Sequence, residues 1–481
     1  MNFTIKKYIL SLHIVIYLHH SAWIVLLYIE KILQSQTFSE AKLSEKFYIK
    51  GGTPLKGEVS IGGAKNSVLK LMAAAILAKG ESKIYNVPDL TDVEIMLNVI
   101  AQLGAKTSYN KEEKSLTIDA TDITNITASY ELVSKMRASF IVLGALVSRC
   151  HEAKVALPGG CAIGERRVDF HIRGLESLGA KIKIENGYVH AKASKLVGSD
   201  IYLDIPSVGA TENIMLASVL AEGSTHIQNA AQEPEIVDLA NFLNTMGADI
   251  SGAGTSEIII NGVKQTDLHP IEYTTIPDRI EAGTFMTAII ATKGKGIIKN
   301  IYPAHLTFFT DKLLKMGANI KLLDPTSMEV SCKNRLNSIN FVTQPYPGFP
   351  TDLQSMAMTL LTTANGVGII TESLYENRFM QVPDLNRMGA DIHQDRNHAI
   401  IKGVKKLSGA TLTASDLRAG ASLVVAALMA EGNSVVEKLH HIDRGYENFE
   451  NKIRLLGGKI ERKDEDSQTN LTEGIHNESY L

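Results

Sequence analysis

Three stretches of the chain are apolar on nearly every side and therefore predict helices buried in the interior. They are KLMAAAILAKG at 70–80, IMLASVLAEG at 214–223 and SLVVAALMAEG at 422–432. A different stretch, EIVDLANFLNTMG at 235–247, is amphipathic and predicts an outer helix that ends at its glycine. Short stretches such as KIYNV at 83–87 and HIQNA at 226–230 predict strands that follow the buried helices.

The same order of elements returns at intervals of about 70 residues, which indicates an internal repeat. A short phrase ends each amphipathic helix: LGAK at 103–106 and 178–181, MGAD at 246–249, MGAN at 316–319, MGAD at 388–391 and LGGK at 456–459. Each unit predicts strand–helix–strand–helix–strand, with the small-residue helix inward. Because repeats bury their faces against neighbours, about six copies favour two closed groups of three, with helices inside and sheets outside. An open solenoid is disfavoured, since no repeat has the polar face of a terminal cap.

The chain has 481 residues, of which 44% are apolar and 21% charged, so it predicts a globular protein of two or three domains. Its net charge of -3 argues against non-specific binding of nucleic acid. Any bound anion must then be met by local clusters of Arg and Lys. Three cysteines without a CxxC pair argue against a disulfide framework and a structural zinc site, and they favour a reducing compartment.

Residues 1–43 form a hydrophobic N-terminal extension whose role stays open. Positions 8–29 have about the length that spans a bilayer, and no small-residue cleavage site follows them. The extension is a wrongly extended or untranslated leader, a membrane anchor, or an interfacial or core-packed helix. In an anchor, Lys6 and Lys7 would place the next domain outside the cytoplasm, against the cytosolic chemistry expected below. The polar residues 462–481 predict a disordered tail.

Charged residues recur where otherwise apolar helices begin. In GGAKNS, at 62–67, Lys65 and Asn66 stand at a glycine-rich turn into a helix, whose free N–H groups suit an anion. Unpaired buried charge is costly, so such groups either pair with one another or face a shared cleft, and the repetition favours the cleft. The other members are Arg137, Asp278, Arg279, Glu281, Asp352, Asp416 and Arg418, with Arg378 and Arg444 following the second strand of two units.

The segment LPGGCAIGERRVDFH at 157–171 predicts a glycine-rich loop with Cys161 at its tip. Arg166 and Arg167 follow closely, and nearby guanidinium groups stabilise a thiolate, which makes the acidity of this thiol tunable. Cys150 and Cys332 stand in apolar surroundings and are interpreted as small core residues. Among the segments of the sequence, this loop gives the most specific indication of a reactive side chain.

The chain resembles the enolpyruvyl transferase superfamily, and within it the UDP-N-acetylglucosamine 1-carboxyvinyltransferase branch, from about Phe47 to about Glu461. The resemblance rests on ten motifs in order: GGAKNS, MRAS, LPGGCAIGERRVD, SVGATEN, EPEIVD, PDRIEAGTF, FPTD, ENRFM, DLRAGASL and HIDRGYE. It implies an α/β fold of two inside-out barrels, each of three βαβαβ-type units, with the active site in the inter-domain cleft. One domain would be 65–276, carrying Cys161, and the other 44–64 with 277–461, carrying Asp352.

The resemblance also implies residue roles. Lys65 and Asn66 would contact phosphoenolpyruvate, Cys161 would protonate its methylene carbon and can form a covalent phospholactoyl adduct, and Asp352 would be the base for the sugar hydroxyl. Arg166, Arg418 and Arg444, with Arg378, would bind phosphate and carboxylate. The positions that match UDP-sugar contacts are Arg137, Arg166, Arg167, Val168, Asp169, Phe170, Ser207, Val208, Asp352 and Leu374.

Three positions depart from the family pattern. Arg167 stands where proline is expected, which changes loop stiffness and the uridine contact. Ile205 and Pro206 stand where some members have a lysine that contacts UDP, and Gln232 replaces a basic residue. None of them touches the core chemistry.

The resemblance implies transfer of enolpyruvyl from phosphoenolpyruvate to the 3′-hydroxyl of UDP-N-acetylglucosamine, with release of phosphate, as the first committed step of peptidoglycan synthesis. The reaction requires neither metal nor organic cofactor, and we expect a cytoplasmic enzyme without nucleic-acid partners. Membrane contact is expected only if the N-terminal extension is real. The alternatives are the shikimate-pathway enolpyruvyl transferase, a non-catalytic UDP-sugar-binding regulator, and a membrane-tethered scaffold suggested by the extension alone.

Overall fold

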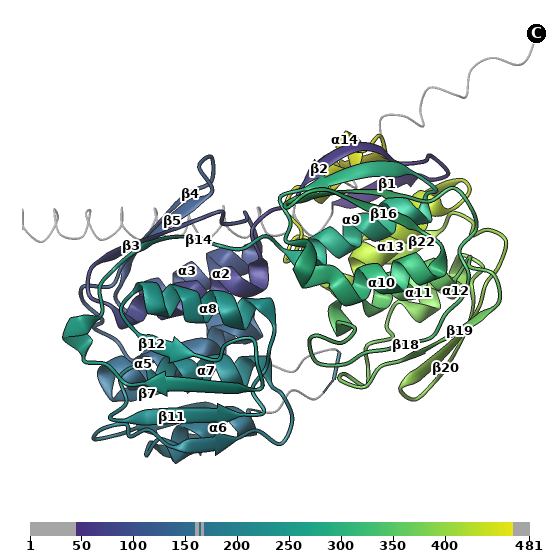
Figure 1. The fold of residues 1–481 in the computed structure, drawn as a ribbon. Coiled ribbons are helices and arrows are strands. Elements are labelled where there is room, and N and C mark those ends of the chain that lie inside the picture. Colours follow the sequence, from purple (N-terminus) through teal and green to yellow (C-terminus); the bar gives the residue numbers. More distant parts are fainter. Residues whose placement is uncertain (1–44, 159–162, 165–167, 465–481) are drawn as a thin grey trace, which may run out of the picture.

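The computed structural model describes residues 45–158, 163–164 and 168–464, and it shows two lobes (Figure 1). Each lobe is built around its own hydrophobic core. The core of the first lobe is drawn from residues 68–271, and that of the second from residues 47–61 together with 280–460. We propose that these lobes are the two domains expected from the sequence.

The strands of the described residues form six four-stranded sheets of one design, three in each lobe. In every sheet an edge strand runs parallel to its neighbour, and the remaining pairings are antiparallel. In each unit, an inner helix comes before the strand that pairs in parallel with the edge strand, and an outer helix comes after that strand. The expected repeat and its α/β class are confirmed. In the described part of the chain the sheets stay separate, so helices enclosed by sheets take the place of one closed strand barrel.

The first lobe contains three units. The first has α2 (Lys65–Ala74), η1 (Ala75–Leu77), β3 (Glu81–Tyr85), α3 (Thr91–Gln102), β4 (Lys106–Asn110), β5 (Ser115–Asp119) and the edge strand β14 (Glu272–Thr274). The second has β6 (Thr127–Ala128), α4 (Tyr130–Val133), η2 (Arg137–Ile141), α5 (Val142–Cys150), β7 (Glu152–Ala156), α6 (Asp169–Ser177), β8 (Lys181–Glu185) and β9 (Tyr188–Lys192). The third has β10 (Asp200–Tyr202), α7 (Val208–Ser218), β11 (Ser224–Gln228), α8 (Pro234–Thr245), β12 (Asp249–Ser251) and β13 (Glu257–Asn261), followed by η3 (Gln265–Asp267).

The second lobe repeats this order. The fourth unit has β2 (Lys56–Ser60), α9 (Arg279–Ala291), β15 (Lys295–Lys299), η4 (Pro303–Leu306), α10 (Thr307–Met316), β16 (Asn319–Asp324) and β17 (Ser327–Ser331). The fifth has β18 (Phe341–Val342), η5 (Thr351–Leu353), α11 (Gln354–Leu361), β19 (Val367–Thr371), α12 (Val382–Arg387), β20 (Asp391–Asp395) and β21 (His398–Lys402). The sixth has β22 (Thr411–Thr413), α13 (Leu417–Met429), β23 (Asn433–Glu437), η6 (Leu439–His441), α14 (Phe449–Leu455), β24 (Lys459–Lys463) and β1 (Lys46–Lys50).

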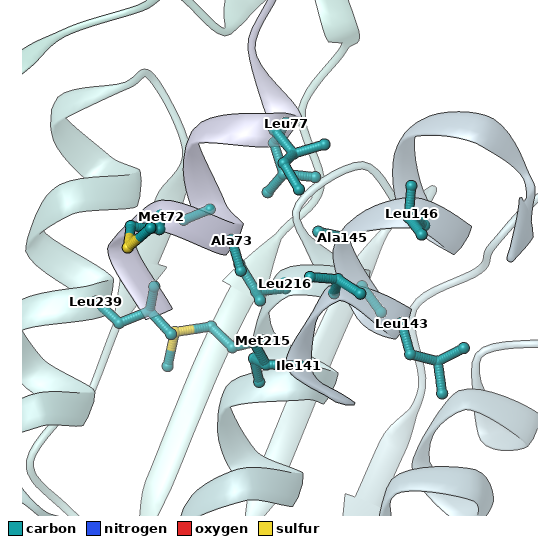
Figure 2. Packing of buried hydrophobic residues seen from close by; sticks show 14 of the residues in the cluster. Met72, Ala73, Leu77, Ile141, Leu143, Ala145, Leu146, Met215, Leu216 and Leu239 are labelled. Carbon is teal, nitrogen blue, oxygen red and sulfur yellow. The ribbon is translucent and has the colours of Figure 1, made fainter. Parts of the chain in front are cut away.

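The stretches expected to be buried helices are the inner helices α2, α7 and α13, which confirms that part of the prediction. In the first lobe, Met72, Leu143 and Met215 from three different helices gather in one core (Figure 2). Complete burial of such side chains stabilises the fold by about 1.5–3 kcal/mol each. Gly144 of α5 permits the close approach of α7, since a Cβ there would lie 2.2 Å from the backbone oxygen of Asn213.

The predicted strands are displaced by two residues. KIYNV and HIQNA were expected at 83–87 and 226–230, whereas β3 and β11 end at Tyr85 and Gln228. The next residues, Asn86 and Asn229, both have φ of 55°, a left-handed conformation that asparagine tolerates and that turns the chain out of the sheet. The glycines that end the outer helices were predicted correctly as left-handed caps, and Gly247, for example, has φ of 110°.

The chain crosses between the lobes twice. Strand β14 returns to pair with β3, whereas β1 and β2 from the start of the described chain complete sheets of the second lobe. The two crossing segments bind each other, because the Ala64 N–H donates to the Ile276 carbonyl (2.7 Å) and the Asp278 N–H donates to the Gly62 carbonyl (2.9 Å). The pair of crossings places the N-terminus of α2 and that of α9 side by side.

The last strand of the described chain, β24, extends beyond its expected end. Strand β24 continues to Lys463, so the expected start of a disordered tail at 462 is wrong by two residues. Arg462 is held there because its guanidinium contacts Glu45, Asp443 and Glu450. The N-terminal extension and residues 465–481 lie outside the described residues. Among the helices that the structure does describe, none has the length and apolar character needed to cross a membrane.

Candidate active site

Lys65, the first residue of α2, stands beside the crossings and meets charged groups from both lobes. Its Nζ lies 2.7 Å from Oδ2 of Asp92, whose Oδ1 accepts a hydrogen bond from Nε of Arg444 at 2.9 Å. Burial lowers the pKa of Lys65, and Asp92 opposes that shift. Burial also tends to raise the pKa of Asp92, but Lys65 and Arg444 outweigh it, so this carboxylate titrates below its usual range. Lys65 and Asp92 are buried and Arg444 is partly exposed, so the three side chains form a charged group that opens at the lobe boundary.

Asp352 organises a second charged group within the second lobe. Its Oδ1 lies 2.6 Å from Nη2 of Arg378, and its Oδ2 lies 3.3 Å from Nη2 of Arg418. Arg418 is 3% exposed, and its Nη1 is buried with no hydrogen-bond partner in the described part of the chain. Burial tends to lower the pKa of Arg418, but Tyr446, Asp352 and Asp278 outweigh it and raise it. Since Arg418 also acts on Lys65, the two groups belong to one electrostatic site.

The other helix-start charges pair rather than face a common space. Asp278 and Asp416 are N-caps that accept from backbone N–H groups of their own helices. Glu281 binds Lys452 (2.5 Å), and Arg279 binds Glu235 across the lobe boundary (3.0 Å). The sequence favoured a shared cleft, and that expectation is wrong for Glu281 and Arg279, which form ion pairs, and for Asp416, which caps its own helix.

Within the Cys161 loop the structure describes Ile163 and Gly164, which both lie against the second lobe. The Asn377 N–H donates to the Ile163 carbonyl at 3.1 Å, and a Cβ on Gly164 would lie 2.6 Å from Oε2 of Glu376. The stretch 376–377 directly precedes Arg378. Ile163 and Gly164 therefore contact the second lobe next to Arg378 of the Asp352 group. Three predicted site residues, Cys161, Arg166 and Arg167, lie outside the described residues.

The positions matched to UDP-sugar contacts lie mostly at helix starts of the first lobe. Val168 is the N-cap of α6, and Ser207 is the N-cap of α7, where its Oγ accepts from the Ala210 N–H (3.4 Å). Leu374 lies in the second lobe, and its N–H donates to Oε1 of Glu372 (3.0 Å). The remaining matched positions that the structure describes are Arg137 at the start of η2, Asp169 and Phe170 at the start of α6, Val208 at the start of α7, and Asp352 in η5 of the second lobe. Asn66, which was expected to contact phosphoenolpyruvate, is the second residue of α2.

A buried histidine supports these helix starts. Nδ1 of His171 lies 2.9 Å from Nδ2 of Asn213, whose Oδ1 accepts from the Gly144 N–H at 2.6 Å. The amide is thereby oriented to donate to Nδ1, so the imidazole is neutral. Burial, with the positive charge of Arg137, lowers the pKa of His171 to about 3.

We expect acid to destabilise the protein through His171. Its folded pKa lies below the ordinary 6.5, so the unfolded chain binds the extra proton and stability falls as the pH drops below that value. The loss is about 2 kcal/mol between pH 6.5 and 5. Urea unfolding at pH 7 and pH 5 should show this loss for the wild type and for His226→Gln, a control on an exposed histidine, but not for His171→Gln. Equal losses in all three proteins would contradict the assignment.

Sequence reasoning missed Asp92 and Glu447. Glu447 is 6% exposed, and its carboxylate accepts from Lys114 Nζ (2.7 Å) and from the Asp89 N–H (3.1 Å) across the lobe boundary. Asp92 sits in the first turn of an amphipathic helix, where acids are common for the helix alone. Its burial, which the sequence does not show, is the signal that sets it apart.

One cavity lies away from this site. It has a volume of about 670 Å³ and is lined by residues at the far ends of η1, α5 and α7, including Lys79, Arg149 and Lys264. Arg149 is occupied there by backbone carbonyls, among them those of Ala78 and Ala120. This cavity therefore contains none of the charged residues that meet at the lobe boundary. Within the described residues, no group of three or more His, Cys, Asp or Glu side chains is arranged to hold a metal ion.

Known proteins match this chain over most of its length. Residues 49–453 match the family described as EPSP synthase (3-phosphoshikimate 1-carboxyvinyltransferase). A UDP-N-acetylglucosamine 1-carboxyvinyltransferase 2 of Carboxydothermus hydrogenoformans is 52% identical over 87% of this chain and 99% of its own. The UDP-N-acetylglucosamine 1-carboxyvinyltransferase of Gloeobacter violaceus is 49% identical over 90% of this chain and 94% of its own.

Solved structures extend the comparison. The enolpyruvyl transferase NikO from Streptomyces tendae superimposes with a TM-score of 0.79 at 26% identity, covering 87% of this chain and 99% of its own. EPSP synthase from Acinetobacter baumannii shares the fold, with a TM-score of 0.68 at 19% identity, and covers 87% of this chain and 100% of its own. Motifs, six-unit fold and relatives at about half identity agree, and the chain belongs to the UDP-N-acetylglucosamine 1-carboxyvinyltransferase branch of the enolpyruvyl transferase family.

Proposed function

We propose that the protein transfers the enolpyruvyl group of phosphoenolpyruvate to the 3′-hydroxyl of UDP-N-acetylglucosamine and releases phosphate. One observation carries the proposal: four cations, Lys65, Arg378, Arg418 and Arg444, are held by two carboxylates at the lobe boundary. Phosphoenolpyruvate carries a phosphate and a carboxylate on a small frame, so it needs several fixed cations, and the planar guanidinium suits both groups. The relatives at about half identity carry the name of this activity.

Asp352 is the proposed base. Two guanidinium groups beside it favour its ionised form, which can accept the proton of the attacking sugar hydroxyl. The hydroxyl oxygen bonds to C2 of phosphoenolpyruvate while Cys161 delivers a proton to C3. The resulting tetrahedral ketal then loses a proton from C3, and its C2–O bond to phosphate breaks, which restores the double bond. Atoms and charge balance without a redox partner or cofactor.

The nucleotide sugar is proposed to lie against the first lobe. Helix starts offer free N–H groups to an anion, and α6 and α7 both begin at matched positions, with Val168 and Ser207 as their N-caps. Arg137 adds a positive charge on the same side. Phe170 offers an aromatic ring that already stacks with Arg173 at 4.8 Å. The residues Arg166 and Arg167 are proposed to complete this part of the site from the loop.

The proposed reaction places the protein at the first committed step of peptidoglycan synthesis and hence in the cytoplasm, where both substrates are made. Cys161 and Arg166 come close in sequence, so the loop is proposed to bring acid and cation to the substrates together. Ion pairs that already link the lobes, such as that of Arg279 with Glu235, support a boundary that water is excluded from during turnover.

Phosphate release tests the proposal. With phosphoenolpyruvate and UDP-N-acetylglucosamine the wild type should release phosphate, and Cys161→Ala should release it about 100-fold more slowly because the proton donor is lost. Cys150→Ala serves as the control and should keep wild-type activity. Release with shikimate 3-phosphate in place of the UDP-sugar would move the protein to the other branch of the family. Substrate binding without any release would instead indicate a regulator.

A further inference from the structure

One buried carboxylate holds two cations that come from different lobes. Asp92 belongs to α3 of the first lobe, and its side chain is 2% exposed. Its two oxygens meet Lys65 Nζ at 2.7 Å and Arg444 Nε at 2.9 Å, with a second, longer contact to Arg444 Nη2 at 3.4 Å. The two ion pairs described for Asp352 are with cations of its own lobe, and those of Asp92 are with one cation from each lobe.

We propose that Asp92 is a positioning residue that assembles Lys65 and Arg444 into one anion-binding pair across the lobe boundary. The inference rests on the proposed function, since the anion is the phosphoenolpyruvate of that reaction. The positive charges of Lys65 and Arg444 act on each other, and the carboxylate that they share offsets this repulsion while leaving the three groups with a net positive charge. A bidentate contact also fixes the plane of the Arg444 guanidinium, which a lysine-type contact would not do.

The placement of Asp92 is not explained by its own helix. An acid in the first turn interacts favourably with the helix dipole even when it is exposed, so the helix gives no reason to bury it. The N-cap residue of α3 is Leu90, which makes no side-chain cap hydrogen bond, and Asp92 points instead to the two cations. Burying a carboxylate costs several kcal/mol unless it is paired. The pairing across the lobes is what offsets that cost.

Asp92 also helps to keep Lys65 protonated, because it raises the pKa of that amine. Burial, Arg418 and Arg444 all lower the pKa of Lys65, and Asp92 is the group that raises it. Without Asp92, Lys65 therefore loses its proton at a lower pH, and the pair loses part of its attraction for an anion. Lys70 of α2 itself pairs with Glu212 on α7. The other charged groups around α2 are Asp92 on α3, Asp278 at the start of α9, Arg418 on α13, Arg444 after η6, Arg137 on η2, and Glu235 and Asp238 on α8.

The test measures kcat and KM for phosphoenolpyruvate, at saturating UDP-N-acetylglucosamine, from pH 6 to pH 9. In Asp92→Asn we expect KM to rise about 30-fold at pH 8, and the alkaline fall of kcat/KM to move about 1–2 pH units lower. Asp92→Glu keeps the charge, so its alkaline fall should stay near the wild-type pH while its KM rises about 5-fold from the longer side chain. If Asp92 served folding alone, the alkaline fall of kcat/KM would lie at the same pH in the wild type, in Asp92→Asn and in Asp92→Glu.

Asp89→Asn is the matched control, because Asp89 precedes the same helix and pairs with Lys111 at 2.8 Å in an exposed position. It should match the wild type in KM and in pH profile. A wild-type KM and pH profile in Asp92→Asn would overturn the inference. If Asp92→Asn does not fold, Asp92→Glu decides: an unchanged KM in that variant would overturn the inference equally.

Binding without turnover separates this inference from the proposed function. Calorimetric titration of phosphoenolpyruvate into the wild type and both Asp92 variants at pH 6 and pH 8 needs no reaction. A wild type that binds phosphoenolpyruvate but releases no phosphate overturns the proposed function, and the dependence of binding on Asp92 and pH still tests the inference. A wild type that releases phosphate, beside an Asp92→Asn variant with unchanged binding, overturns the inference alone.

Discussion

Replacing Asp352 with Asn is expected to lower kcat about 1000-fold while leaving KM for phosphoenolpyruvate unchanged or lower. The amide cannot accept the hydroxyl proton, and general base catalysis contributes about 10²–10⁴-fold. The same change removes the negative charge between Arg378 and Arg418, which are 7% and 3% exposed, so the site becomes more attractive to an anion. Steady-state phosphate release over a range of phosphoenolpyruvate concentrations measures both constants.

Asp384→Asn is the matched control for this change. Asp384 is likewise an acid of the second lobe that pairs with an arginine, Arg387 at 2.9 Å, but it is buried on α12 away from the site. Its replacement should leave kcat at the wild-type value while lowering thermal stability. A kcat within about 10-fold of wild type for Asp352→Asn would show that another group removes the proton.

Replacing Arg279 with Met is expected to cost about 3–5 kcal/mol of stability, because it leaves a buried carboxylate without its partner. The side chains of Arg279 and Glu235 are 10% and 5% exposed and lie 3.0 Å apart, one from each lobe. Burial also raises the pKa of the neighbouring Glu233, which Arg279 opposes. For a protein of this size the loss corresponds to a fall of about 3–5 °C in the unfolding midpoint, measured by differential scanning calorimetry.

Lys195→Met tests the same chemistry on the surface. Lys195 and Glu222 also form an ion pair, at 2.7 Å, but their side chains are 61% and 65% exposed. Water screens such a pair, and its loss should cost less than about 1 kcal/mol. If both variants lost the same stability, burial of the Arg279 pair would not be the source of the effect.

The architecture could be predicted from the sequence because the same order of helices and strands recurs in six units. Apolar helices such as that at 422–432 need an interior on every side, and glycine after each outer helix marks its end, so periodicity alone gives the order of elements. The strand ends were less certain, since the left-handed asparagines at 86 and 229 look like ordinary polar strand residues in a sequence. Separate sheets rather than closed barrels follow from pairings that no single repeat encodes.

The site was predicted in part. Motifs identified Lys65, Asp352 and the arginines, and the structure brings Lys65 and Arg444 together although they are far apart in sequence. Asp92 was not predicted as a site residue, because an acid in the first turn of a helix is common and only its burial between the two lobes is unusual. Other helix-start acids, such as Asp416, turned out to cap their own helices. A local pattern cannot say which of these uses a given carboxylate serves.

The double crossing between lobes has a consequence for synthesis on the ribosome. All strands of the first lobe lie between residues 81 and 274, so this lobe can fold as soon as that stretch has emerged. Strand β1 emerges earlier, yet it pairs with β23 and β24, which are among the last elements made. Its apolar residues Phe47 and Ile49 must therefore wait on the order of tens of seconds for their partners, with the unpaired strand open to chaperones and to aggregation.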